Sequence, residues 1–253
     1  MKGTVIAVTG KGGVGKTMLS ALLIGILGDS QPGKSILAID ADPDSNLAES
    51  LGVEFQKTVG DIREDMLREK PSPGVEKKKY LDAKVFEITV ETDNFDLLVM
   101  GRPEGQGCYC AINHMLRDIV DNITKSYDYI VIDAEAGLEH LSRRTTENVD
   151  SLLVISDASK KGLDTAKRIK DLTRELNIKF NNLYLILNRV TPENKDVLED
   201  EAGKLGIEVI GSIPDDPEVS DLDLRGRPIT GISQESKAYK EAENIARKLI
   251  KNG

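Results

Sequence analysis

A glycine-rich segment near the start of the chain has the residue types and spacing of a phosphate-binding loop. Gly10 to Thr17 fits the pattern G-x-x-x-x-G-K-[ST] and stands between an apolar run and an apolar helical pattern. In such a loop, backbone N–H groups point into one concavity and the helix N-terminus adds partial positive charge. We expect Lys16 to contact the β- and γ-phosphates of a nucleotide and Thr17 to offer its hydroxyl to Mg²⁺. The other nucleotide contacts predicted here are Gly12, Gly13, Val14, Gly15 and Met18.

Carboxylate side chains follow two other apolar runs. Ile36 to Asp40 leads into an acidic loop that contains Asp42, and Tyr129 to Asp133 ends in a further aspartate. Parallel strands deliver their carboxyl ends to the sheet edge where α/β folds bind ligands. These carboxylates are therefore candidates to act on a bound nucleotide. Helix capping by Asp44 or Ser45 is a second interpretation of the acidic loop, and it is compatible with the first.

The chain has two cysteines, Cys108 and Cys110, separated by one residue. Two such thiols cannot form a disulfide framework, and they supply about half of the four ligands that a structural zinc or an iron–sulfur cluster needs. They lie at or just before a predicted helix N-terminus, which favours the thiolate. Three interpretations stay open: inert buried thiols, a three-ligand site with His114 in one chain, or a four-thiolate site for Ni²⁺ or Zn²⁺ completed by a second chain.

Short apolar runs alternate with helical patterns, which predicts a three-layer α/β/α fold with a mostly parallel central sheet. Runs such as Ile130 to Ile132 lack alternation of apolar and polar residues, as expected of strands covered on both faces. The predicted strands are Thr4 to Val8, Ile36 to Asp40, Phe95 to Met100, Tyr129 to Asp133, Leu152 to Ser156, Leu183 to Leu187 and Val209 to Ile213. The predicted helices are Lys16 to Leu27, Ile112 to Ile123, Thr165 to Leu176, Pro192 to Leu205 and Gln234 to Lys251. We interpret Lys70 to Lys84 as a polar excursion and residues 1–253 as a single domain.

The composition limits the classes of partner. The 253 residues contain 34 Lys plus Arg against 43 Asp plus Glu, a formal net charge of −9, and the aromatic residues are six Tyr and four Phe. The excess of negative charge and the few aromatic platforms disfavour a nucleic-acid-binding surface. The chain opens with no pattern of a secretory signal, and its longest apolar run, Met18 to Leu27, is too short to span a bilayer. We therefore expect a cytoplasmic protein without nucleic-acid or membrane partners.

Lys11 makes the assignment of the loop to a family more specific, because the general phosphate cradle does not need a lysine at this position. With Lys11, the loop resembles that of the deviant Walker A ATPases, the family of MinD, ParA, the nitrogenase iron protein and CooC. The resemblance implies an ATPase homodimer in which Lys11 reaches the partner's phosphates, Asp42 orients the attacking water and Asp133 is a water-mediated Mg²⁺ ligand. Asp40 is expected beside Asp42, either as a carboxylate linked to Mg²⁺ or as one that supports the site without touching the ion, and the composition does not rank the two aspartates.

The same resemblance implies where the base binds. In this family, residues just after one of the strands contact the nucleotide base. In this chain the corresponding segment is Leu187-Asn188-Arg189-Val190-Thr191. Guanine recognition usually needs N-K-x-D, and Thr191 occupies the fourth position, so ATP is predicted rather than GTP. The predicted contact to the adenine base is Asn188, with Arg189 beside it. Backbone groups of Pro214 to Asp216 are expected near the base.

Two segments narrow the resemblance to nickel-insertion ATPases of the CooC and AcsF type. They are the run Glu135 to His140 and the C-x-C pair before a helix. We interpret His140 itself as structural rather than catalytic. The resemblance implies a metallochaperone that binds one Ni²⁺, or Zn²⁺, at Cys108 and Cys110 across the homodimer. It would deliver the metal to the apoenzyme of carbon monoxide dehydrogenase or acetyl-CoA synthase.

Two other functions stay open. A MinD- or ParA-type positioning ATPase would use no metal. MinD-like proteins end in a basic amphipathic membrane helix, whereas Gln234 to Lys251 predicts a docked helix of mixed charge. A reductase like the nitrogenase iron protein would hold a [4Fe–4S] cluster between subunits, but in that family the two cysteines come from separate loops.

Overall fold

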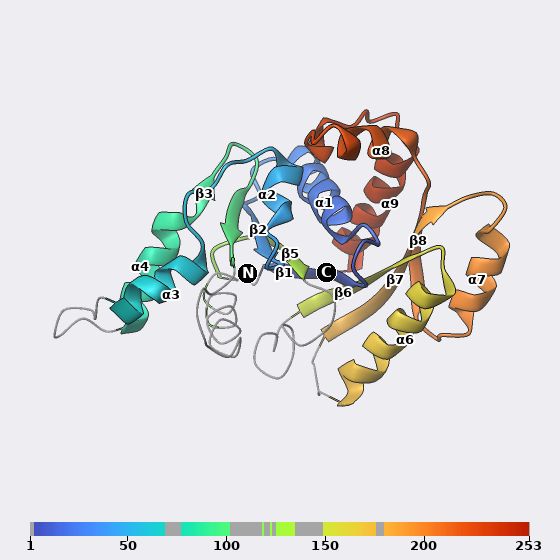
Figure 1. The fold of residues 1–253 in the computed structure, drawn as a ribbon, viewed down its shortest axis with the longest axis horizontal. Coiled ribbons are helices and arrows are strands. Elements are labelled where there is room, and N and C mark those ends of the chain that lie inside the picture. Colours follow the sequence, from blue (N-terminus) through green and yellow to red (C-terminus); the bar gives the residue numbers. More distant parts are fainter. Residues whose placement is uncertain are drawn as a thin grey trace.

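An eight-stranded sheet forms the centre of the molecule (Figure 1). The structure is a computed structural model that describes residues 3–68, 77–101, 118, 122, 125–134, 149–175 and 180–252. The strand order is β3-β4-β2-β5-β1-β6-β7-β8, and every neighbouring pair is parallel except β3 with β4. The strands are β1 (Thr4–Gly10), β2 (Ile36–Ala41), β3 (Val90–Glu91), β4 (Asp96–Val99), β5 (Tyr129–Ala134), β6 (Val149–Asp157), β7 (Phe180–Val190) and β8 (Glu208–Pro214).

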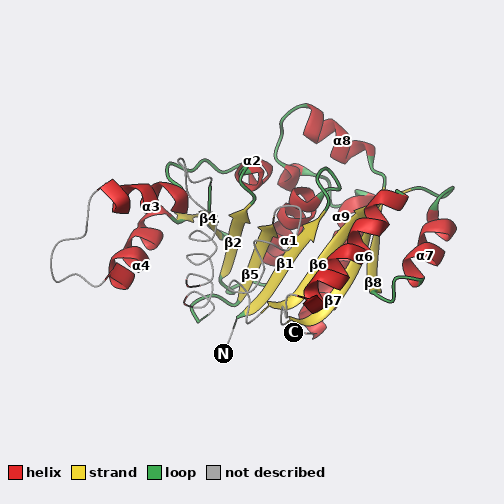
Figure 2. Cartoon of the chain, turned by 60° about the horizontal axis from the view of Figure 1, so that its bottom comes forward, coloured by secondary structure: helices red, strands yellow, loops and turns green. Residues whose placement is uncertain are grey.

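Helices cover both faces of this sheet, so the predicted three-layer α/β/α class is confirmed (Figure 2). The helices α1, α2 and α9 contribute to the apolar core on one face, and α3, α4, α6 and α7 to the core on the other. The helices are α1 (Lys16–Ser30), α2 (Asn46–Leu51), α3 (Val59–Arg68), α4 (Lys77–Ile88), α6 (Lys160–Glu175), α7 (Lys195–Gly203), α8 (Pro217–Leu224) and α9 (Lys237–Asn252), with a 3₁₀ turn, η1 (Ile229–Gly231).

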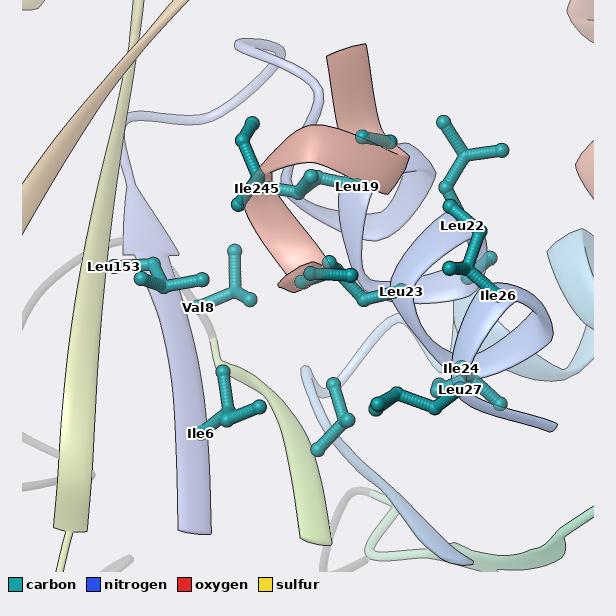
Figure 3. Close-up of a cluster of buried hydrophobic side chains, with 14 of the residues drawn as sticks. Ile6, Val8, Leu19, Leu22, Leu23, Ile24, Ile26, Leu27, Leu153 and Ile245 are labelled. Carbon is teal, nitrogen blue, oxygen red and sulfur yellow. The ribbon is translucent and has the colours of Figure 1, made fainter. Parts of the chain in front are cut away.

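The central strand β1 shows why the strand sequences are apolar throughout. Successive side chains of a strand point to opposite faces, and both faces are buried here, so Val5 joins one core cluster and Ile6 joins the other. Ile6 lies in the cluster that also holds Leu19 and Leu23 of α1 and Ile245 of α9 (Figure 3). Each fully buried leucine or isoleucine contributes about 1.5–3 kcal/mol to folding. This packing fixes the start of α1, and with it the loop between β1 and α1.

The segment Lys70 to Lys84, which the sequence indicates is a polar excursion, is helical over its described part. Residues 77–84 form the first two turns of α4. Leu81, Val85 and Ile88 recur at helical spacing and pack against the core cluster that also contains Ile62 of α3. The lysines around these residues kept the apolar stripe from being recognised in the sequence. The elements β3, α2, α3 and α8 were not predicted from the sequence either.

The last helix docks on the sheet as predicted, although it begins at Lys237 rather than Gln234. Its apolar face is buried against β8 and α1 through residues that include Ala242, Ile245 and Leu249. Among the described residues, no helix is long and apolar enough to cross a membrane. The predicted helix Ile112 to Ile123 lies outside the described residues, apart from two helical positions at 118 and 122.

Candidate nucleotide-binding site

The loop between β1 and α1 has the backbone that a phosphate cradle needs. Gly15 has φ +96°, and a Cβ built on it would lie 2.4 Å from Nδ2 of Asn188. A Cβ on Gly10 would lie 2.3 Å from the backbone oxygen of Ile155 on β6. Only glycine fits a left-handed backbone with so close a neighbour. The glycines therefore let the loop turn tightly above the ends of β1, β6 and β7.

The two lysines of the loop have different environments. Lys16 is only 7% exposed, and its Nζ lies 3.5 Å from the backbone oxygen of Lys11. Lys11 is exposed. A buried ammonium on the first turn of α1 is a fixed positive charge beside the loop N–H groups, whereas the Lys11 side chain is free to reach outward from the molecule.

The carboxylate of Asp133 lies directly beneath the start of α1. Thr17 Oγ1 donates a hydrogen bond to its Oδ2 at 2.7 Å, and Ser20 Oγ donates to its Oδ1 at 3.1 Å. Burial raises the pKa of Asp133 to about 6, although these two hydrogen bonds lower it. Carboxylate and hydroxyl oxygens are the ligands that Mg²⁺ prefers, so Thr17 and Asp133 together fit that ion.

The structure separates the two aspartates of the acidic loop. Asp40 is fully buried at the end of β2, where its Oδ1 accepts from Asp42 N at 3.2 Å and its Oδ2 accepts from Leu47 N at 2.9 Å. Asp42 is partly exposed and lines the cavity beside the phosphate loop. Ser45 occupies the N-cap position of α2 without a side-chain capping hydrogen bond. Asp40 therefore binds an N–H of the first turn of α2 and holds the acidic loop, while Asp42 faces the cavity.

Asp40 is expected to make the nucleotide-free protein less stable as pH rises. Burial, together with the negative charge of Asp133, raises the pKa of Asp40 to about 7. Between about pH 4 and pH 7 the unfolded chain ionises this group while the folded chain keeps its proton, so stability is lost over that interval. Relative to Asp40→Asn, the wild type should lose at least about 1.4 kcal/mol of unfolding free energy, the equivalent of one pKa unit. Urea unfolding of both proteins at pH 4 and pH 8 measures this loss, and parallel pH profiles would contradict it.

Asn188 holds the phosphate loop from the neighbouring strand β7. Its side chain is 3% exposed, and Nδ2 donates to the backbone oxygen of Val14 at 2.7 Å. Its Oδ1 accepts from Arg189 N at 2.9 Å. These two contacts leave one hydrogen of Nδ2 for a nucleotide base. The contact between Asn188 and the base stays a prediction. Arg189 is exposed with φ +58°, an unusual backbone for a residue other than glycine, and its side chain lines the cavity.

A cavity of about 580 Å³ brings most of the predicted residues together. The predicted residues that line it are Gly12, Gly13, Gly15, Lys16, Thr17, Met18, Asp42, Asn188, Arg189 and Pro214. Val14 and Asp133 are buried behind it. The cavity volume lies within the ordinary range for small-molecule sites.

Other residues of this cavity were not predicted from the sequence. They include Asn46 and Glu49 on α2, Asp223 on α8, and Arg227 after that helix. An aspartate directly before a proline is a helix-start signal, and Asp216-Pro217 begins α8 in this way. That signal would have predicted α8. The residues that α2 contributes to the cavity could not be predicted in this way, because their position depends on how the chain folds after Asp42.

Cys108, Cys110, His114 and His140 lie outside the described residues. The described chain leads toward the cysteines at Gly101, just after β4. Met100 N donates to the backbone oxygen of Asp40 at 2.8 Å. The described chain therefore leaves the sheet at Gly101, at the same edge as the acidic loop.

Comparison with known proteins identifies the family of this site. Residues 5–229 match CbiA, the CobQ/CobB/MinD/ParA nucleotide-binding domain. The chain belongs to the CobQ/CobB/MinD/ParA family. Within this family it is a P-loop ATPase, and its solved relatives have the same three-layer fold. One of these is the MinD cell division protein of Aquifex aeolicus, with a TM-score of 0.73, 25% identity, and coverage of 98% of this chain and 97% of that chain.

Two curated relatives in the CobQ/CobB/MinD/ParA family match almost the whole chain. An uncharacterized ATP-binding protein of Methanocaldococcus jannaschii is 54% identical over 250 residues, which cover 97% of this chain and 98% of that protein. The carbon monoxide dehydrogenase accessory protein CooC of Rhodospirillum rubrum is 35% identical over 238 residues, which cover 87% of each chain. These identities extend well beyond the phosphate loop, so the likeness involves most of the chain.

Proposed function

We propose that the protein is a metal-insertion ATPase that delivers nickel to carbon monoxide dehydrogenase or acetyl-CoA synthase. The observation that carries this proposal is the place where the chain leads into the C-x-C segment. β4 lies parallel to β2, so the chain passes Gly101 at the sheet edge that also holds the phosphate loop and Asp42. A metal site that begins at this edge is well placed to respond to the nucleotide. The 35% identity to CooC, a carbon monoxide dehydrogenase accessory protein, supports the choice of client.

The proposed metal site is shared between two copies of the chain. Cys108 and Cys110 are the two cysteines of the sequence, so four thiolates require a second chain. Lys11 is exposed at the same edge, where it would reach the phosphates held by the partner. ATP would then favour the closed homodimer and hydrolysis would reopen it. The nucleotide moves the metal equilibrium by the difference in metal affinity between these two states.

In the proposed hydrolytic site each residue has one task. Lys16 and the loop N–H groups would bind the phosphates, Thr17 would hold Mg²⁺ with Asp133 as its water-mediated ligand, and Asp42 would orient the water that attacks the γ-phosphate. The bound Mg²⁺ would supply charge neutralisation on the phosphates. Asn188 keeps the loop in place through Val14.

Replacing either cysteine should remove metal binding and leave the nucleotide site intact. Cys108→Ser and Cys110→Ser are each expected to weaken Ni²⁺ and Zn²⁺ binding by about 100-fold or more, because a hydroxyl is a poor ligand for these borderline-soft ions. Competition titration with a chromogenic chelator under reducing conditions measures this change. The Kd for Mg·ADP should stay within about twofold in both variants, since the phosphate loop is unchanged. Wild-type metal affinity in either variant would rule out the shared thiolate site.

A positioning ATPase of the MinD type is the second candidate, and the whole-chain similarity to MinD supports it. Against it stands α9, whose apolar face is already buried on β8 and α1. Co-sedimentation with anionic liposomes in the presence of ATP would favour this function over metal insertion. An iron chromophore in anaerobically purified protein would instead favour a reductase with a [4Fe–4S] cluster between subunits.

A further inference from the structure

Beyond the phosphate loop, the ends of two neighbouring strands line the cavity. The end of β7 contributes Asn188 and Arg189, and the end of β8 contributes Pro214 to Asp216. Asp215 N donates to the backbone oxygen of Val190 at 3.0 Å and joins the two strand ends. We call Pro214 to Asp216 the β8 wall. In the described part of the chain β8 is the last strand of the sheet and pairs with β7 alone, so the helices after it supply the other contacts that hold this wall.

The side chain of Asp216 connects this wall to two helices. It is only 9% exposed. Its Oδ1 accepts from Glu218 N at 3.0 Å and caps the start of α8. Its Oδ2 accepts from Ser236 Oγ at 2.8 Å and from Ala238 N at 3.1 Å, which ties it to the start of α9. One carboxylate therefore binds donors from segments about 20 residues apart in the chain.

These hydrogen bonds keep Asp216 ionised. Burial by itself would raise the pKa of Asp216, but hydrogen bonds from Ala238 N, Ser236 Oγ and Glu218 N lower it below its ordinary value. Every contact to the carboxylate is a donor, so the charged, acceptor-only form suits the site. A neutral or shorter side chain would leave at least one buried N–H without its partner, which is costly.

The helix α9 then carries this connection to the phosphate loop. Glu241 Oε1 on α9 accepts from Ser212 N on β8 at 3.0 Å, and Lys248 Nζ donates to the backbone oxygen of Ile210 at 2.6 Å. A Cβ on Gly211 would lie 2.5 Å from the side chain of Ile245, so α9 packs directly on the strand. On its other side α9 packs against α1, the helix that begins with the phosphate loop (Figure 1; Figure 3).

We propose that Asp216 is a positioning residue for the nucleoside: it fixes the β8 wall to α9, and through α9 it sets the distance between that wall and the phosphate loop. ATP spans both regions. Its phosphates are held by the loop whether or not Asp216 is intact, whereas its nucleoside contacts the wall only when the wall is held in place. Asp216 itself does not touch the reacting phosphate and is not a catalytic residue.

The test compares two ligands that share the phosphate site. In Asp216→Ser the serine still caps α8, but its hydroxyl is too short to reach Ser236 and Ala238. We expect the Kd for ADP to rise about tenfold, equivalent to the loss of roughly 1.4 kcal/mol of binding. The Kd for inorganic triphosphate, which has no nucleoside, should stay within about twofold. In steady-state hydrolysis the KM for ATP should rise while kcat stays within about twofold. Isothermal titration calorimetry measures both Kd values.

A matched control separates positioning from general stability. Asp150→Asn alters a carboxylate with similar contacts at the opposite edge of the sheet, where its oxygens accept from Val5 N and from Asn181 Nδ2. It should lower the melting temperature without changing the Kd for ADP. Ser236→Ala removes one of the Asp216 contacts and should raise the Kd for ADP by about threefold. The proposal is overturned if Asp216→Ser weakens triphosphate and ADP equally, or if neither the Asp216 nor the Ser236 variant changes ADP binding in folded protein.

Discussion

Lys16→Ala is expected to lower kcat/KM for ATP by about 10³-fold or more. Lys16 is 7% exposed, and it lies on the first turn of α1 beside the loop N–H groups. A fixed cation in this position stabilises the charge that develops on the phosphates, and alanine supplies none. Phosphate release assays over a range of Mg·ATP concentrations measure the change.

Lys34→Ala is the control for this prediction. Lys34 is a surface lysine that pairs with Asp128 at 2.8 Å before the start of β2, at the other edge of the sheet. Exposed ion pairs contribute little, so this variant should hydrolyse ATP within about twofold of the wild type. Activity of Lys16→Ala within tenfold of the wild type would mean that the phosphates bind elsewhere in the cavity.

Asp42→Asn is expected to lower kcat by about 10² to 10³-fold while the Kd for ATP stays within about threefold. Asparagine keeps the size of the side chain, and its oxygen can still accept from Asp44 N, the contact that Asp42 Oδ1 makes at 3.0 Å. The acidic loop should therefore keep its shape. What is lost is the negative charge that orients the attacking water. Single-turnover hydrolysis separates this loss from any change in nucleotide binding.

Asp44→Asn is the matched control, because Asp44 lines the same cavity two residues further along the chain. Its kcat should stay within about threefold of the wild type. Equal losses in the two variants would indicate that the loop acts through its total charge rather than through one positioned carboxylate.

The sequence was sufficient to predict the sheet and the phosphate loop because both are specified locally. The apolar run from Thr4 to Val8 needs cover on both faces, and the glycines after it permit one tight turn into α1. All seven predicted strands are present, with ends that differ by a few residues. Helix ends were less accurate: Pro192 to Leu205 was predicted where α7 runs from Lys195 to Gly203.

The roles of the two aspartates of the acidic loop could not be separated from sequence. Asp40 and Asp42 are both short carboxylates at the end of one strand. Only the fold shows that Leu47 N comes back to bind Asp40, which turns that side chain inward and leaves Asp42 toward the cavity. Strand alternation places residues 40 and 42 on the same side, so periodicity carried no information about which one faces the nucleotide.

The side-chain contacts of Asp216 in the β8 wall could not be predicted from the sequence, for a physical reason. Asp216 was expected near the base through its backbone, but its side chain binds Ser236 and Ala238. Those donors lie some 20 residues further along the chain, and no local pattern links them to Asp216. Similarly, the apolar stripe of α4 was not predicted because charged residues are interspersed among its apolar ones.

In the proposed cycle, ATP closes a homodimer that shares one metal ion. Native mass spectrometry of the wild type with Ni²⁺, Mg²⁺ and a non-hydrolysable ATP analogue tests it most directly. We predict dimers that carry two nucleotides and one Ni²⁺, and a lower nickel occupancy when ADP replaces the analogue. One Ni²⁺ per chain, or the same nickel occupancy and dimer fraction with both nucleotides, would contradict it.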